Sequence, residues 1–292
     1  VVAALSGGDP RAMRFGAQFY RRAQLDAAID FWSDRTKNGA NFIVAIAGDF
    51  TLARIRPLVE RYLASLPRGT TERPRDRGFI NVRGGRHELT ARGVERARTA
   101  IGFVAPLEET SDNLTALQLV RDLIARTLTE RLREQMGGTY DVDVSLATDV
   151  VPPAKYAITI EFESAPGRAN ALAEAVREGL RDLRRSGPDS VVFRAAREAR
   201  VRDFDDRAEN NEYWVSELTS HARFGWSLPD IATHAQAAGA VSLADAKRAC
   251  ARFIPVGDYI RVTMRPGGVA PNARAVLPPR RPPPRGSDGS SR

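Results

Sequence analysis

The sequence predicts an α+β fold, in which helices pack on one face of a mostly antiparallel sheet, preceded by part of another lobe. Strand-like segments come first, separated by one long helical segment, and a run of helical segments follows. A last strand-like segment, residues 259–265, closes the set. Strands that follow one another before a run of helices are typical of α+β domains.

Length and composition indicate a globular protein. The 292 residues are enough for one large or two medium domains, and 42% are hydrophobic. Apolar runs of about 18 residues are missing, so we expect no membrane span. The first 15 residues lack the basic and apolar regions of a signal peptide. Because the chain begins with valine, we expect a fragment or a processed product.

The net charge of +8 does not predict nucleic-acid binding. Only three of the 44 basic residues are lysines, and five of the arginines lie in the terminal segment 267–292. Elsewhere basic residues alternate with acidic ones, as in residues 194–212, which is the pattern of a solvated helix face. We therefore expect no nucleic-acid partner.

Residues 1–67 predict only a few elements of a lobe. An amphipathic helix is expected near residues 25–39, and another over residues 51–67. Between them, Phe42 to Ala47 is almost continuously apolar, which predicts a strand covered on both faces. One strand and two helices cannot close a core, so we expect 1–67 to be the C-terminal part of a preceding lobe.

Residues 68–78 are rich in charge, Thr, Gly and Pro and predict a linker, and residues 79–266 predict a complete lobe. A long helix, near 111–136, would measure about 38 Å at 1.5 Å per residue. The other expected elements are strands at 86–92, 97–106, 139–149, 155–164 and 259–265, and helices at 167–185, 189–222, 228–237 and 242–253. Residues 267–292 are rich in Pro, Arg, Gly and Ser and predict a disordered tail.

The histidines and the cysteine predict no catalytic or metal site. His87, His221 and His234 are the only histidines, and none has the helical spacing of a zinc motif. A nucleophile turn of the Gly-x-Ser-x-Gly type is also missing. Cys250, the single cysteine, lies in an amphipathic segment and is expected to be a small buried hydrophobe.

The stretch RLREQMGGTYDVDVSL ends the long helix, turns on two glycines and opens a strand. Gly137 and Gly138 permit the left-handed backbone that stops a helix and reverses the chain. Arg133 would then lie at the helix C-terminus, where the helix dipole favours a cation. Tyr140 would lie at the rim of the sheet, close to Arg133. The spacing of Arg133 and Tyr140 alone is compatible with a structural role, an arginine at a helix end and a capping tyrosine, as well as with a functional site.

Three segments in order resemble the pitrilysin/insulinase family of zinc metallopeptidases, and within it the bacterial PQQ-associated zinc proteases. They are NFIVAIAGDFTLARIRPLVERYLASLP, LTERLREQMGGTYDVDVSL and RAENNEYWVSEL. The resemblance spans about residues 20–266. It implies a metallopeptidase lobe of the pitrilysin type, in which Arg133 and Tyr140 match an arginine and a tyrosine seven positions apart that hydrogen-bond the substrate carbonyl.

The resemblance implies the C-terminal, substrate-binding half of a zinc metalloendopeptidase that hydrolyses peptides in an enclosed chamber. Its zinc would be held by an N-terminal half through a His-x-x-Glu-His motif, which this sequence lacks. We therefore expect zinc in the full enzyme, no metal or cofactor on this fragment, and no activity of this chain alone. The expected partners are the zinc-bearing half and a peptide substrate. The alternative is a non-catalytic scaffold or inactive subunit of the same fold. Localisation is left open, with a periplasmic or exported site as the suggestion from bacterial relatives.

Overall fold

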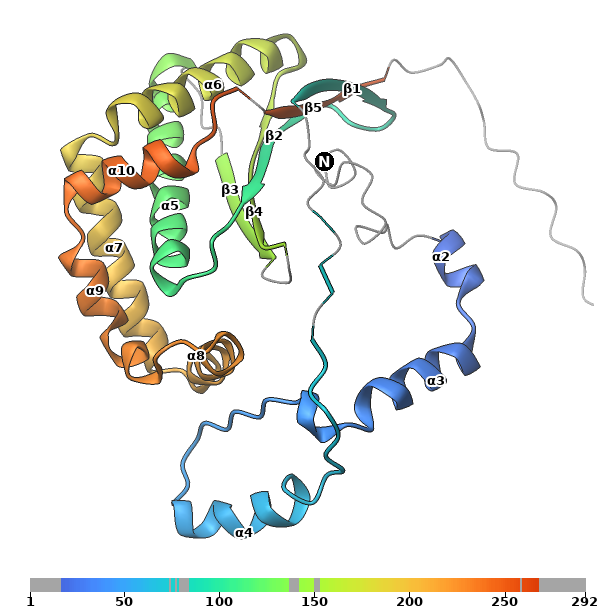
Figure 1. Ribbon diagram of the computed structural model, residues 1–292. Helices are drawn as coiled ribbons and strands as arrows, with labels where there is room; N and C mark the ends of the chain where they lie inside the picture. Colours follow the sequence, from blue (N-terminus) through green and yellow to red (C-terminus); the bar gives the residue numbers. More distant parts are fainter. Residues whose placement is uncertain are drawn as a thin grey trace, which may run out of the picture.

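The computed structural model describes residues 17–73, 75–76, 78, 84–136, 142–149, 153–257 and 259–267. Within these, one lobe is built from a five-stranded sheet and the helices on one side of it, to the left in Figure 1. Its strands are β1 (Gly85–Ala91), β2 (Ala97–Pro106), β3 (Val142–Asp149), β4 (Lys155–Ser164) and β5 (Ile260–Pro266). Its helices are α5 (Ser111–Met136), α6 (Ala169–Ser186), α7 (Ser190–Ala208), α8 (Asn211–Phe224), α9 (His234–Ala240) and α10 (Leu243–Phe253), with short 3₁₀ turns η2 (Pro166–Arg168) and η3 (Leu228–Thr233).

The strand order is β1-β5-β2-β4-β3, so the last strand of the chain lies between the first two. The pairs β5–β2, β2–β4 and β4–β3 are antiparallel, whereas β1–β5 is parallel. The predicted fold class is confirmed, with a mixed rather than purely antiparallel sheet. The parallel pair arises because β5 returns to the sheet from the helical layer, far along the chain from β1.

Alternation along β4 decides which face of the sheet carries the core. Tyr156, Ile158, Ile160 and Phe162 are buried, and the residues between them are partly exposed. The buried side packs against α5, whose Leu117, Val120, Leu123, Ile124, Leu128 and Leu132 are also buried. The alternating apolar residues of β4 and the apolar residues on one side of α5, which recur with the helical period of 3.6, therefore pack in one core.

A glycine lies where α6 packs on α5. A Cβ at Gly179 would lie 2.7 Å from Cδ2 of Leu128, so the Leu128 side chain would have to shift to make room for it. Gly179 is itself in a helix interior, where glycine costs roughly 1 kcal/mol relative to alanine. We infer that this position allows the two helices to approach each other.

Two predictions about single elements are wrong. The helix expected over 189–222 is two helices, because Asn210 adopts an extended backbone and caps a new helix: its Oδ1 accepts a hydrogen bond from the Glu212 amide at 2.8 Å. The strand expected over Phe42 to Ala47 is also missing from the described structure. A strand needs neighbours for its backbone hydrogen bonds, and residues 17–73 provide none.

The segment before the lobe consists of α2 (Ala17–Arg22), α3 (Leu25–Thr36), η1 (Gly39–Asn41) and α4 (Leu52–Tyr62). Figure 1 shows these elements apart from the helical layer. No residue of α3 or α4 is buried, and large apolar side chains such as Trp32 remain about two-thirds exposed, at 69%. The tail expected to be disordered lies outside the described residues except for Gly267.

Candidate functional site

Arg133 lies in the last turn of α5 and its side chain is exposed. Its neighbour Leu132 is fully buried, so the helix turns Arg133 away from the core. Arg133 lines an open groove of about 900 Å³ between α5 and α7. The structure thus places this predicted site residue at the surface, at the edge of an open groove.

Tyr140, the second predicted site residue, lies outside the described residues. The nearest described residue after it is Val142, which is 7% exposed and begins β3. The proximity of Arg133 and Tyr140 therefore stays a prediction.

The groove carries charges of both signs. Its walls include Arg121, Asp122, Arg126, Glu130, Arg133, Arg200 and Asp203. Arg200 is 7% exposed and links the two helices, because its guanidinium pairs with Asp122 and donates to Oε1 of Gln118 at 3.2 Å. A buried charge held in this way is fixed in position. Among the described residues, Arg133 forms no such ion pair with a carboxylate.

A second group of polar side chains lies where α8 meets α9. One ligand atom from each of Glu217, His221 and His234 lies within 4.8 Å of those of the other two. Burial lowers the pKa of His234, which favours the neutral form of its ring. These are residue types that hold transition metals. This group is not predicted from the sequence: the Glu217–His221 spacing of four residues is a signal that the sequence contains, but only the fold brings His234 beside them.

Cys250 is fully buried in α10, as the sequence predicts. Burial raises the pKa of its thiol to about 12. Because the thiolate is the reactive form, Cys250 has no nucleophilic role at neutral pH.

Comparison with known proteins agrees with this lobe architecture. A family model described as "Peptidase M16 inactive domain" matches residues 23–200. The chain therefore belongs to the peptidase M16 inactive domain family.

Among individual proteins, the chain is 27% identical over 154 residues to the probable zinc protease PqqL of Haemophilus influenzae. This match covers 53% of this chain and 16% of PqqL. It also resembles a crystal structure of a peptidase M16 inactive domain from Pseudomonas fluorescens, with a TM-score of 0.75, 15% identity, and 92% of this chain and 64% of that chain covered. The ferredoxin protease FusC, solved with Arabidopsis ferredoxin, has a TM-score of 0.67 at 17% identity, covering 91% of this chain and 29% of that chain.

The chain thus spans only part of the length of these relatives. The family and the relatives agree that the chain is a domain of zinc protease-like proteins, and the structural likenesses show the fold. Within the part of the chain that the structure describes, every helix is too short or too polar to cross a bilayer.

Proposed function

We propose that this chain is the C-terminal, substrate-binding half of a zinc metalloendopeptidase that cuts peptides in an enclosed chamber. The observation that carries this proposal is Arg133, an exposed guanidinium at the end of α5 in a domain of a peptidase family. Arg133 and Tyr140 would donate hydrogen bonds to the substrate carbonyl and to the charge that develops on it. Zinc held by the N-terminal half would supply the activated water.

The exposed apolar side chains of residues 25–66 support an N-terminal partner. Phe31 and Trp32 are each 69% exposed and Val44 is 56% exposed. Clusters of exposed apolar side chains of this kind mark surfaces that another part of a protein covers. We infer that the preceding half supplies both the missing strands beside Phe42 to Ala47 and the cover for these side chains.

The experiment reconstitutes activity from two halves. The 292-residue chain is mixed with an N-terminal half that bears the His-x-x-Glu-His motif, and cleavage of a quenched fluorescent peptide is followed. We expect no cleavage by this chain alone and cleavage by the mixture. Arg133→Ala and Tyr140→Phe should each lower kcat by about 10²- to 10³-fold, the range for loss of one preorganised donor.

Arg202→Ala is the matched control, because Arg202 is an exposed arginine on the neighbouring helix α7. It should leave kcat unchanged. Full activity of the Arg133→Ala and Tyr140→Phe mixtures would refute the site assignment. Cleavage that requires this chain but neither residue would favour the alternative of a non-catalytic scaffold.

We also propose that the full protein acts outside the cytoplasm. The Escherichia coli PqqL, whose structure resembles this chain with a TM-score of 0.60 at 16% identity, is described as a periplasmic protease. Immunodetection of the full protein in fractionated cells tests this proposal, and recovery with cytoplasmic markers alone would contradict it.

A further inference from the structure

Helix α8 presents Glu217 and His221 four residues apart, on one face of the helix. His234, the first residue of α9, faces them: its ring centroid lies 5.6 Å from that of His221. We propose that Glu217, His221 and His234 form a binding site for a divalent transition metal of the zinc class. This site is separate from the zinc expected in the N-terminal half and does not depend on the proposed function.

The distances between the side chains suit such an ion after a small adjustment. Nε2 of His221 lies 3.8 Å from Oε2 of Glu217, and one ligand atom of each of the three residues lies within 4.8 Å of the others. In a tetrahedral zinc site with bonds of about 2.0–2.2 Å, ligand atoms are roughly 3.3–3.6 Å apart. Side-chain movements of about 1 Å or less would therefore close the site.

Nδ1 of each histidine is within hydrogen-bonding distance of another protein group, which leaves Nε2 of each ring to bind a metal. Nδ1 of His221 lies 2.7 Å from the carbonyl oxygen of Ser227, so this nitrogen carries the proton and donates it. Nδ1 of His234 lies 3.0 Å from the Tyr213 hydroxyl. Histidine ligands commonly hold the second ring nitrogen in this way, which fixes the tautomer and the orientation of the ring.

The strongest single sign of a ligand is the Nε2 atom of His234. It is buried and has no hydrogen-bond partner in the described structure. Buried polar atoms rarely lack a partner, so this one needs an explanation. His221 beside it is only 1% exposed, and Glu217 is 22% exposed at its side chain. A cation between these three groups would satisfy the nitrogen that the protein leaves unpaired.

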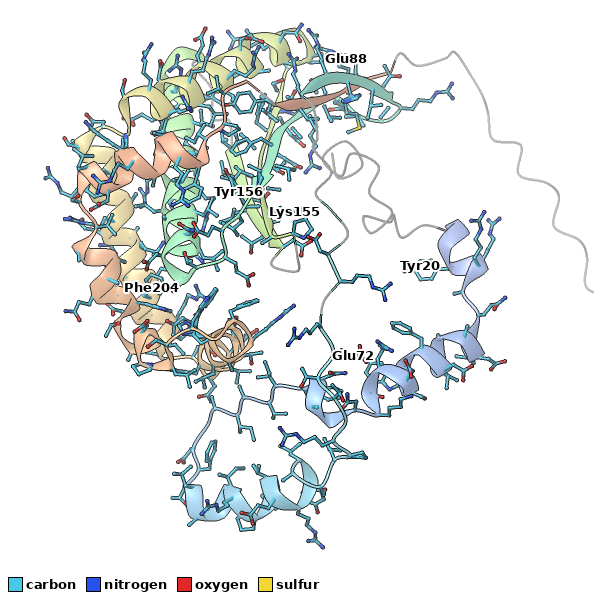
Figure 2. All side chains as sticks on the ribbon, viewed as in Figure 1. Tyr20, Glu72, Glu88, Lys155, Tyr156 and Phe204 are labelled. Carbon is cyan, nitrogen blue, oxygen red and sulfur yellow. The ribbon has the colours of Figure 1, made fainter. Side chains whose placement is uncertain are left out.

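A metal in this site would also have a structural role. The main core does not extend to α8 and α9, which meet α7 in a small separate cluster of four buried residues, Phe204, Tyr213, Ile231 and Ala238. Phe204, labelled in Figure 2, marks this end of α7. A metal that joins α8 to α9 would hold together elements that bury little apolar surface.

His234 also borders a cavity of about 420 Å³ whose other walls include Ser111, Asp112 and Thr115 at the start of α5. Arg133 lies 18 residues after Thr115 along the same helix, about 27 Å at 1.5 Å per residue. The proposed site therefore lies far from Arg133.

The test uses the untagged 292-residue chain, freed of metal by a chelator that is then removed. Zn²⁺ binding is measured by isothermal titration calorimetry, and Co²⁺ replaces zinc for visible absorption, which reports coordination geometry. We expect one equivalent of each ion, intense Co²⁺ bands of a four-coordinate site, and a higher Tm with zinc. Glu217→Gln and His234→Gln should weaken binding by more than the 10- to 100-fold that loss of an outer-shell partner costs.

The matched controls are His87→Gln, which changes an exposed histidine on β1, and Glu212→Gln, which changes an exposed carboxylate on α8. Both should bind zinc as the parent chain does. Circular dichroism checks that each variant folds. If His234→Gln does not fold, zinc binding by Glu217→Gln provides the test instead, because Glu217 is only half-buried. Absence of saturable binding, binding that survives Glu217→Gln, or equal loss in His87→Gln would each overturn the proposal.

Discussion

Tyr156 shows how one hydroxyl joins the sheet to the helical layer. Its ring lies in the core at 3% exposure, and its hydroxyl donates a hydrogen bond of 2.8 Å to the carbonyl oxygen of Phe253 at the end of α10. Figure 2 shows Tyr156 on β4, between the sheet and the helices. Burial raises the pKa of this phenol to about 12, so the hydroxyl stays protonated at any ordinary pH.

We expect Tyr156→Phe to lower the free energy of unfolding by about 1–2 kcal/mol, because the Phe253 carbonyl loses its donor inside the core. The folded pKa lies above the unfolded value of about 10, so the stabilisation is complete below pH 10 and is lost as the pH rises towards 12. Urea unfolding of both proteins at pH 8 and above pH 10 measures this. A difference that grows with pH would contradict the assignment.

At the scale of elements, the break between α7 and α8 comes from one residue. Asn210 leaves the helical conformation, because its φ of −104° and ψ of 128° are typical of extended backbone, and its side chain caps the next helix. The charged, helix-favouring sequence on both sides concealed this break. The cap matters because α8 carries Glu217 and His221, whose direction depends on where the helix begins.

We expect Asn210→Ala to destabilise the protein by about 1 kcal/mol, the usual cost of losing an N-cap side chain. Asn211→Ala is the control, because Asn211 is exposed and already inside α8. Thermal unfolding measures both variants, and hydrogen exchange of the α8 amides locates the effect. Equal destabilisation by the two substitutions would mean that the cap is not the cause.

At the scale of the whole molecule, buried and exposed apolar side chains lie in different parts of the chain. All buried hydrophobic residues of the described structure lie between Ala97 and Val262. Residues 25–66 instead expose large apolar side chains, including Leu25 at 75% and Leu52 at 81%. We infer that the lobe folds without residues 25–66, and that a partner covers the exposed apolar side chains of this segment.

We expect a chain of residues 79–267 to unfold cooperatively with a Tm within a few degrees of the full chain, because it keeps both buried clusters. Gly267 is retained because its amide donates to the carbonyl oxygen of Ala91 at 2.7 Å. The shorter chain should also self-associate less, which analytical ultracentrifugation measures. Loss of cooperative unfolding in calorimetry would show that the earlier segment is part of the same folding unit.

The sequence by itself determined most of the lobe's elements and their faces, because helix and strand periodicity are local properties that a core only needs to match. The long helix α5, the strand β4 and the burial of Cys250 are confirmed in this way. Only the tertiary structure decided that β5 enters between β1 and β2, and that His234 comes to lie beside Glu217 and His221. Those neighbours are set by packing between segments far apart in the chain. The missing strand at Phe42 to Ala47 has the same cause, since a strand forms only where another strand supplies its hydrogen bonds.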